Sequence, residues 1–461
     1  MDLDKIKSIV NSALKAGAEE AEVFYLINDV FTARIANSKI LEPKGVVDEG
    51  IAVRVIANGG LGFSATNDLS EEGIMMAVKR ALKVARRRPL PFKYSLPKPQ
   101  PYSPVEGIYD KELAQISREK AVELAYRALN AAIQYDKRVV DVSGTLNIVK
   151  YNIKIANSNG VEAEDRGTFL EGVIATTARE AGVESEGYES TACRILKDYE
   201  PEKIGQESAK MAVDGLKAEK INEGTYCIVL APRAAADLAL RVGYFSHPII
   251  AKSTYQFFLG KEGQKVASEK LSILDDPRMP RGPYSCSIDD EGVPSQTKYL
   301  IKNGVFKGFY YDSYAAAMNG KTSTGNGFRP YGPAGFTRLP GKNFLTEPSA
   351  APSTLIIKGG DFKADEIISD VKDGLLIKHM HYVRVTNPVR GDYTAVLRMG
   401  LYKIRNGEIV SAVKKSRLVD NIMSILNNVD AVANDVKVAG QWGRYAVAPT
   451  LRISKVRIVP V

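Results

Sequence analysis

The chain has 461 residues, 44% of them hydrophobic, a length and composition that predict about three globular domains. No apolar run reaches the ~18 residues that a membrane-spanning helix needs. The first four residues, Met1-Asp2-Leu3-Asp4, are acidic where a secretory signal would be basic. The three cysteines are far apart and form no Cys-x-x-Cys pair, which favours reduced thiols. We therefore expect a cytoplasmic protein with no membrane partner.

The net charge of +9 does not predict a nucleic-acid partner. The one tight basic cluster, Arg86-Arg87-Arg88, follows a predicted helix, where cations interact favourably with the negative end of the helix dipole. Elsewhere Lys and Arg alternate with Asp and Glu, and no helix-turn-helix, zinc-finger or RNP pattern is present.

The N-terminal region predicts helices packed on a mixed sheet. Apolar residues at helical spacing indicate a helix that begins near Leu3 and ends at Gly17, and a second helix that follows a Ser70 cap. The predicted strands are residues 22–27, 30–36 and 50–57. Residues 89–104 contain six prolines and read as an extended connector. We therefore place an N-terminal α/β domain at 1–104.

A central α/β domain is predicted at residues 105–220. It has a helix around Leu124, an alternating strand over 139–156 and a last helix over 204–216. A turn at 157–160 leads into strand segments that cover residues 161–164 and 167–178.

Residues 221–461 predict a C-terminal, mostly antiparallel β domain, so the fold class is α+β. Asn303-Gly304 and Asn406-Gly407 lie between β-prone runs, the strongest local signal for two-residue hairpins. Further strands are predicted at 225–231, 354–357, 375–385 and 396–404, and helices after Pro232 and at 364–371 and 419–427.

Polar loops beside these hairpins supply the candidate substrate-binding residues. Loops held by a rigid sheet often carry function. The candidates are Asp289, Asp290, Glu291, Ser323, Thr324, Gly325, Asn326, Asn387 and Asp392. Clustered carboxylates can serve as acid and base or hold a hard cation. A structural or interface role, as loop caps and solvated charge, is the preferred interpretation, and a turn is preferred around Asn387 and Asp392.

The three histidines are the remaining metal candidates. His379 and His381 are two apart on a predicted strand and so share a face, and His247 is a possible third ligand. We prefer a solvated strand edge at His379 and His381, with a peptide or a protein as their partner if they bind anything. No catalytic residue is assigned.

Several motifs occur in the order seen in a known family. They are DDP at 275–277, DDEGVP at 289–294, LIKNGVFKGFYYDSYAA at 300–316 and STGN at 323–326, with further agreement at 48–66, 155–162 and 386–393. In this respect the chain resembles the TldD/PmbA family, also called modulators of DNA gyrase. The resemblance covers most of the chain.

The resemblance implies a zinc peptidase site in the TldD branch of the family, with two His one helical turn apart and a Glu beside the first. Matching residues 231–234 to the family's strand-to-helix junction places Leu240, Arg241 and Phe245 at those positions. No His here is followed by Glu, and residues 438–442, which match the region of a further Cys ligand, contain no cysteine. The chain is therefore more similar to the PmbA/TldE branch.

That branch implies a subunit without its own zinc, which forms a dimer with a zinc-bearing TldD-like chain. Such a complex is expected to degrade or process unfolded, extended peptides in the cytoplasm, with this chain itself non-catalytic. Two alternatives stay open: a self-sufficient homodimeric peptidase, and a regulatory protein that binds a DNA-associated partner.

Overall fold

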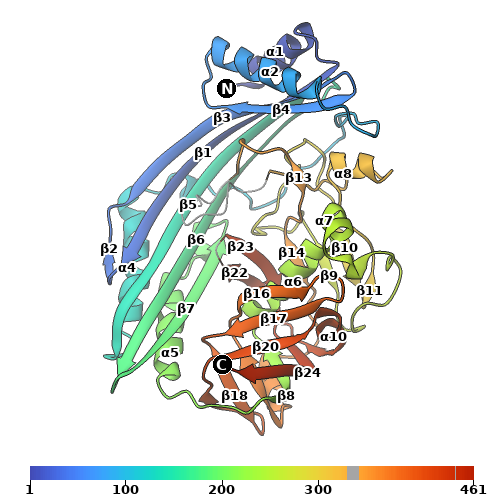
Figure 1. The fold of residues 1–461 in the computed structure, drawn as a ribbon. Helices are drawn as coiled ribbons and strands as arrows, with labels where there is room; N and C mark the ends of the chain where they lie inside the picture. The colour runs from blue at the N-terminus through green and yellow to red at the C-terminus, as the bar shows by residue number, and fades with distance from the viewer. Residues whose placement is uncertain (330–341, 442) are drawn as a thin grey trace.

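The computed structural model of the chain describes residues 1–329, 342–441 and 443–461. Within these ranges the strands form sheets of seven, nine and six strands and one two-stranded ribbon (Figure 1). Helices pack on sheets whose pairings are mostly antiparallel, so the predicted α+β class is confirmed. No described helix is both long and apolar enough to cross a membrane.

The first sheet has the strand order β4-β3-β1-β5-β6-β7, with β2 beside β1. Its strands are β1 (Glu20–Ala36), β2 (Lys39–Ile40), β3 (Lys44–Ala57), β4 (Gly60–Thr66), β5 (Val139–Asn157), β6 (Glu162–Glu180) and β7 (Val183–Cys193). Every pairing is antiparallel, which differs from the mixed sheet expected here. Short turns connect most of the neighbours, and β1 and β5 also pair antiparallel although residues 37–138 separate them. Strands from both sides of residue 104 share this sheet, and the domain boundaries stay a prediction.

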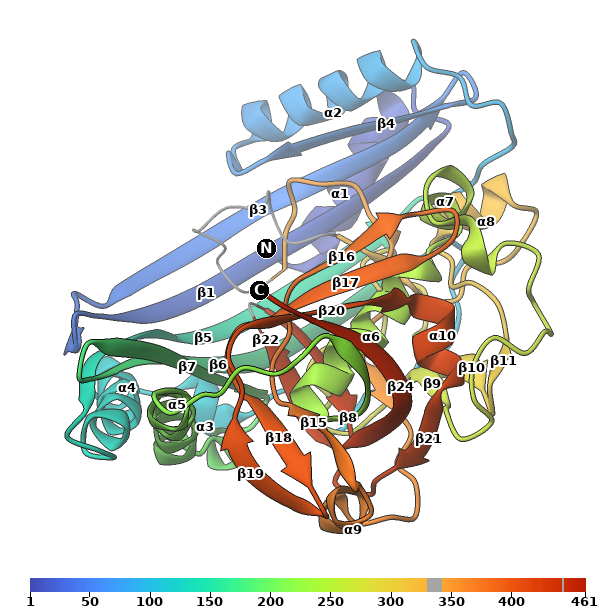
Figure 2. The same cartoon turned by 60° about the horizontal axis from the view of Figure 1, so that its bottom comes forward.

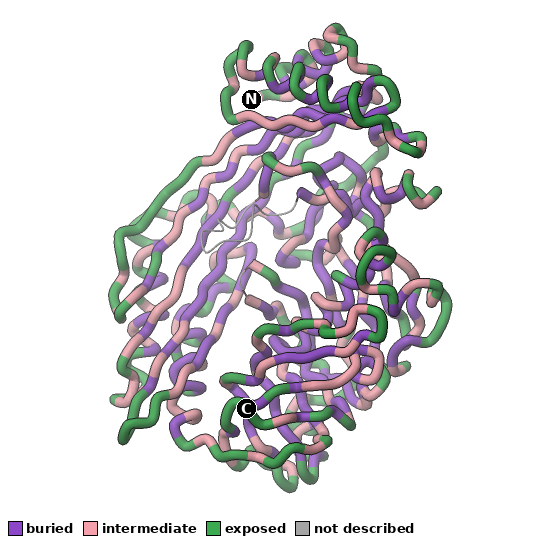
Figure 3. The backbone as a smooth tube through the Cα atoms, viewed as in Figure 1, coloured by how far each residue is buried: buried purple, intermediate pink, exposed green. Residues whose placement is uncertain are grey.

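Along each strand of this curved sheet, successive side chains point alternately to the two faces. On β1, Val23 and Tyr25 pack under α1 (Leu3–Lys15) and α2 (Glu71–Ala85). Farther along the same face lie α3 (Lys111–Ala114), α4 (Arg118–Ile133) and α5 (Pro201–Gly215), as Figure 2 shows. Phe24 and Leu26 point to the other face, which is covered by residues of the C-terminal region. Both faces are therefore buried along much of the sheet (Figure 3).

Local signals place the ends of α2 as predicted. The Ser70 hydroxyl accepts a hydrogen bond from the backbone N–H of Gly73 at 3.1 Å, and Glu71 and Glu72 lie in the positive first turn. Gly62 lets the helix approach β4, since a Cβ there would lie 2.0 Å from the carbonyl oxygen of Ala81.

The C-terminal region holds the other two large sheets. The nine-stranded sheet contains β8 (Gly224–Leu230), β15 (Asp373–Ile377), β16 (His381–Asn387), β17 (Asp392–Leu397), β18 (Leu401–Arg405), β19 (Glu408–Ala412), β20 (Ser416–Asn421), β21 (Val429–Val432) and β24 (Leu451–Pro460). The six-stranded sheet contains β9 (Ile273–Asp275), β10 (Lys298–Lys302), β11 (Val305–Phe306), β14 (Leu355–Ile357), β22 (Lys437–Gln441) and β23 (Arg444–Ala448). The ribbon pairs β12 (Gly327–Phe328) with β13 (Ser349–Ala350).

One helix joins these two sheets. The helix α6 (Pro232–Phe245) contacts β14, β22 and β23 of the six-stranded sheet and β8 of the nine-stranded sheet, and its apolar residues belong to the large C-terminal core. The shorter helices are α7 (Pro248–Ser253), α8 (Ser313–Met318), α9 (Ala364–Ser369), α10 (Ile422–Asn427) and the 3₁₀ turns η1 (Leu196–Asp198) and η2 (Gln256–Phe258). The core between the two sheets is thus organised around α6.

The hairpin predictions are confirmed, while several strand limits differ. Asn303 and Gly304 have φ values of 48° and 77° between β10 and β11, and Asn406 and Gly407 have 50° and 82° between β18 and β19. Positive φ at both central residues is the type I′ pattern.

The strand expected over 375–385 is broken between β15 and β16, and the one over 396–404 between β17 and β18. Conversely, 22–27 and 30–36 form the single strand β1.

Candidate functional site

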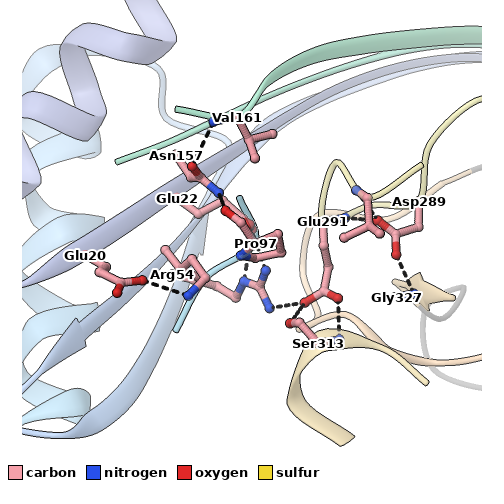
Figure 4. Close-up of polar contacts among 12 residues, drawn as sticks. Glu20, Glu22, Arg54, Pro97, Asn157, Val161, Asp289, Glu291, Ser313 and Gly327 are labelled. Carbon is pink, nitrogen blue, oxygen red and sulfur yellow. Dashed lines mark hydrogen bonds and ion pairs between the residues drawn. The ribbon is translucent and has the colours of Figure 1, made fainter. Parts of the chain in front are cut away.

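The acidic loop at residues 289–291 is buried, which differs from the solvated charge expected there. Asp289, Asp290 and Glu291 are at most 1% exposed. The Glu291 carboxylate accepts a hydrogen bond from Arg54 Nη1 at 2.8 Å, and it also accepts the backbone N–H and the hydroxyl of Ser313. Arg54 in turn donates from Nε and Nη2 to Glu22, at 2.9 and 2.7 Å. The loop thereby ties the first sheet to the C-terminal region (Figure 4).

Its other two carboxylates organise nearby backbone. Asp289 accepts hydrogen bonds from the N–H groups of Glu291, Val293 and Gly327. Asp290 accepts from the Arg329 N–H and forms a 2.6 Å ion pair with Lys342. Burial, together with the neighbouring Glu291 charge, raises the pKa of Asp289 well above its ordinary value. These contacts support the structural role that was preferred for the loop.

The Ser323–Asn326 candidates surround one fully buried amide. Asn326 donates from Nδ2 to Asp275 at 2.7 Å and to the Ala351 carbonyl at 2.8 Å, and its Oδ1 accepts from Lys298 and Thr324. The φ of Gly325 is +69°, and a Cβ there would lie 2.4 Å from the Pro294 carbonyl oxygen. The amide therefore has no free hydrogen-bonding capacity for a substrate.

We expect Asn326→Ala to lower the midpoint of thermal unfolding by several degrees, because Asp275 and Lys298 lose a buried partner at a cost of about 1–3 kcal/mol. Differential scanning calorimetry would measure this shift. Ser323→Ala changes one half-buried hydroxyl of the same loop and serves as the control. Equal midpoints for the Asn326→Ala variant and the wild type would contradict a structural role for this amide.

Asn387 and Asp392 close the β16–β17 hairpin. Asn387 Oδ1 accepts the N–H groups of Val389 and Arg390, and Asp392 pairs with Arg390 at 2.6 Å. The φ of Gly391 is +81°, a conformation that glycine adopts at little cost. These contacts agree with the turn role preferred for both residues, and binding of substrate there stays a prediction.

The three histidines do not form a metal cluster. The Nδ1 atom of His247 caps α7 by accepting the Ile249 N–H at 3.1 Å. His379 is fully buried rather than solvated, and its ring lies 3.8 Å from the half-buried His381 ring. In the described ranges, no three His, Cys, Asp or Glu side chains are grouped so that they could hold a metal ion.

A polar face of α6, which the sequence reasoning missed, lies beside these two histidines. Arg233, Asp237 and Arg241 follow one another at four-residue intervals and so share one face of the helix. The Arg233 guanidinium lies 4.3 Å from the centre of the Tyr188 ring, and that ring lies 5.4 Å from the His379 ring. The i, i+4, i+8 spacing of charges on an otherwise apolar helix is the signal that could have revealed this face.

We call Arg233, Asp237, Arg241, His379, His381 and Tyr393 the α6 polar cluster. Burial raises the pKa of Asp237 to about 6, although the charges of Arg233 and Arg241 act in the opposite direction. Burial lowers the pKa of His379 well below its ordinary value, and the Arg233 charge adds to this effect. His379 is consequently a neutral imidazole at neutral pH.

The residues matched to the zinc motif lie on the same helix. Phe245 is 1% exposed and packs edge-on against Phe257, with ring centres 4.8 Å apart. Leu240 is half-buried against the large core, and the half-buried Arg241 forms no ion pair with a described residue. Two apolar side chains and one cation thus occupy the three matched positions.

Comparison with known families assigns the chain. Models of the PmbA/TldA metallopeptidase family match it in series: domain 1 at residues 21–85, the central domain at 111–216 and the C-terminal domain at 223–460. The chain belongs to the PmbA/TldD family. The resemblance stated from the motifs is thereby confirmed.

Individual relatives span nearly the whole chain. The metalloprotease PmbA homolog of Haemophilus influenzae is 27% identical over 450 residues, 93% of this chain and 90% of the relative. The metalloprotease TldD homolog of Buchnera aphidicola subsp. Acyrthosiphon pisum is 25% identical over 422 residues, 88% and 83% of the two chains. The crystal structure of TldE from Thermococcus kodakarensis has the same fold, with a TM-score of 0.85 at 21% identity over 98% of this chain and 99% of that one. This PmbA/TldD chain thus has relatives named as metalloproteases of both branches.

Proposed function

We propose that the chain is a PmbA/TldE-like subunit of a cytoplasmic metallopeptidase complex, and that the complex's zinc belongs to a TldD-like partner. The observation that carries this proposal is the chemistry at the three matched positions of α6. Leu240 and Phe245 have no metal-binding atom, and the Arg241 cation would repel Zn²⁺ and cannot activate water as a glutamate does. The residues present therefore do not fit a zinc site on this helix.

The proposed role is to support a partner's chemistry on extended, unfolded peptides. Kinship to relatives named as metalloproteases supports proteolysis as the reaction. The fold that the chain shares with a protein titled TldE agrees with a place in this family. The exposed strand edges of the C-terminal region offer backbone groups to which an extended peptide can pair.

The test measures zinc content and peptidase activity of the purified chain alone and then after mixing with a TldD-like chain that carries the His-Glu-x-x-x-His motif. We expect substoichiometric zinc and no cleavage of unfolded casein by the chain alone, and cleavage after the partner is added. A chelator should abolish that activity. The Leu240→His, Arg241→Glu double variant is expected to remain inactive alone, because residues 438–442, which match the region of the further Cys ligand, contain no cysteine.

One tightly bound metal per chain, with cleavage by the chain alone, would overturn the proposal in favour of a self-sufficient homodimeric peptidase. Salt-sensitive DNA binding by the chain, without any effect on the partner's activity, would instead favour the regulatory alternative.

A further inference from the structure

A groove lies between the C-terminal ends of α1 and α2, the two helices that cover one end of the first sheet (Figure 1). Its volume is about 420 Å³, and it is lined by Ala16, Lys79, Leu82, Lys83, Arg86 and Arg87, a set that we call the α2 basic groove. Leu82 is 3% exposed and belongs to the core beneath the helices, whereas the four cations are exposed. A volume of this size is typical of sites for small ligands.

The helix itself brings the cations of this groove to one side. Lys79, Lys83 and Arg87 follow one another at four-residue intervals, so they share one face of α2. The turn continues past the last helical residue, since the Arg87 N–H donates to the Val84 carbonyl at 3.1 Å. Over these eight residues the helix rises by about 12 Å. The cations therefore form a short stripe rather than a scattered set.

Carboxylates do not balance the positive charge of the groove. None of its four cations forms an ion pair with a residue that the structure describes, and no Asp or Glu lines it. The carboxylates of α2, Glu71 and Glu72, lie in its first turn, at the opposite end. Glu19, which is close to Ala16 in the sequence, accepts a backbone N–H of the β3–β4 turn instead.

The ends of the two helices compensate only part of this charge. Arg86 Nη2 donates to the Ala16 carbonyl at 3.4 Å, where α1 ends. The C-terminal end of a helix acts as about half a negative charge, so the two ends leave roughly three of the four positive charges for a ligand. The ligand that matches this groove is therefore an anion with several charges close together.

A chain of linked phosphates fits the stripe better than an acidic peptide does. Three linked phosphates carry about four to five negative charges at neutral pH, because each inner phosphate keeps one and a terminal phosphate nearly two. In an extended peptide, side chains on one face are about 6.6 Å apart, so only about two or three carboxylates would face the stripe. Arginine binds phosphate oxygens through two parallel hydrogen bonds and lysine binds them as a point charge, and the groove contains both.

We propose that the α2 basic groove binds a chain of linked phosphates, either of a nucleoside triphosphate or of an inorganic polyphosphate. Lys79 and Lys83 attract the chain along the helix, and the guanidiniums of Arg86 and Arg87 donate to its oxygens. The groove is on the side of the first sheet opposite the C-terminal region. The inference thus goes beyond the proposed subunit role and does not depend on it.

The test is isothermal titration calorimetry of the full chain at about 50 mM NaCl, where surface charges are weakly screened, without divalent cations, which would neutralise the phosphates. Sodium tripolyphosphate and ATP should each bind with a Kd below about 1 mM, and AMP should bind at least about tenfold more weakly. A lower Kd for ATP than for tripolyphosphate would identify the nucleotide as the source of the phosphates, and an equal or higher one the inorganic chain.

Two double variants locate the binding. Lys83→Gln with Arg87→Gln should raise the Kd of tripolyphosphate at least about tenfold, and so should Lys79→Gln with Arg86→Gln. All four side chains are exposed, so the thermal midpoint of either variant should stay close to that of the wild type.

Lys415→Gln with Arg417→Gln is the matched control. It removes the same charge at two exposed residues that form no ion pair in the described part of the chain, and it should leave the Kd within about twofold of the wild-type value. No binding of either triphosphate at about 1 mM, unchanged Kd values in both groove variants, or an equal loss in the control would overturn the site.

Two further ligands test the class of partner. Tighter binding of hexaglutamate than of tripolyphosphate would overturn the proposal in favour of an acidic protein segment. Tighter binding of a short oligothymidylate would overturn it in favour of a nucleic acid.

Discussion

Replacing Arg54 with methionine is expected to lower the free energy of unfolding by about 3–5 kcal/mol, the typical cost of removing one member of a buried ion network. Arg54 is 2% exposed and sits between Glu22 and Glu291, which are 1% and 0% exposed. The pKa of the guanidinium would be lowered by burial alone, but the Glu22 and Glu291 charges raise it well above its ordinary value. Without Arg54, the buried Glu291 has no other ion pair in the described part of the chain, and the buried Glu22 keeps only Arg329 Nη2, 3.6 Å away.

The measurement is the urea dependence of tryptophan and tyrosine fluorescence, together with the midpoint of thermal unfolding. Arg34→Met is the matched control, because Arg34 lies on the same strand β1 as Glu22, is exposed and has no side-chain partner in the described part of the chain. We expect the control to change the free energy of unfolding by less than about 0.5 kcal/mol. Similar effects of the two substitutions would mean that the network does not stabilise the fold.

Replacing Gly187 with alanine is expected to lower the free energy of unfolding by about 3 kcal/mol, because helix α5 packs directly on strand β7 at this residue. A Cβ there would lie 1.9 Å from the Ser208 carbonyl oxygen and 2.6 Å from the Ala212 nitrogen, both of them backbone atoms that cannot rotate away. The helix would have to move outward and would lose the hydrogen bond between Ser208 and Thr176, now 2.9 Å long.

Hydrogen exchange of residues 201–215 would report this movement as faster exchange of the α5 amides, alongside a lower thermal midpoint. Gly45→Ala is the control: its Cβ would meet only the mobile end of the Arg118 side chain, at 3.3 Å. Unchanged exchange in the Gly187→Ala variant would contradict the close contact between α5 and β7.

Local chemistry in the sequence predicted those features that depend on neighbouring residues alone. The Ser70 cap and the two Asn-Gly hairpins form as expected, since each needs only a few adjacent residues. The break assumed in β1 does not exist, because distant residues form a hydrogen bond and an ion pair with the polar side chains Asn28 and Asp29 within it. Asn28 donates to the Lys342 carbonyl at 2.7 Å, and Asp29 pairs with Lys150 at 2.8 Å.

The candidate site was less predictable, because its contacts also join residues that lie far apart in the sequence. Asp289, Asp290 and Glu291 look like a solvated turn until Arg54 and Lys342 are brought to them from remote segments. His379 lies two residues after the end of β15, yet it is buried next to Tyr188 of β7 rather than left at a solvated edge. The α6 polar cluster draws its members from residues 233–241, 379–381 and 393, and only the fold shows that they meet.

The contact between Arg54 and Glu291 also constrains the order of events during synthesis. The two residues are 237 positions apart, so at ~5–20 residues per second the ribosome delivers Glu291 roughly 10–50 s after Arg54. During that interval the Phe24 and Leu26 face of the nascent first sheet has no C-terminal cover. The growing chain therefore exposes an apolar surface for many seconds, and its yield in a cell should depend on chaperones that bind nascent chains.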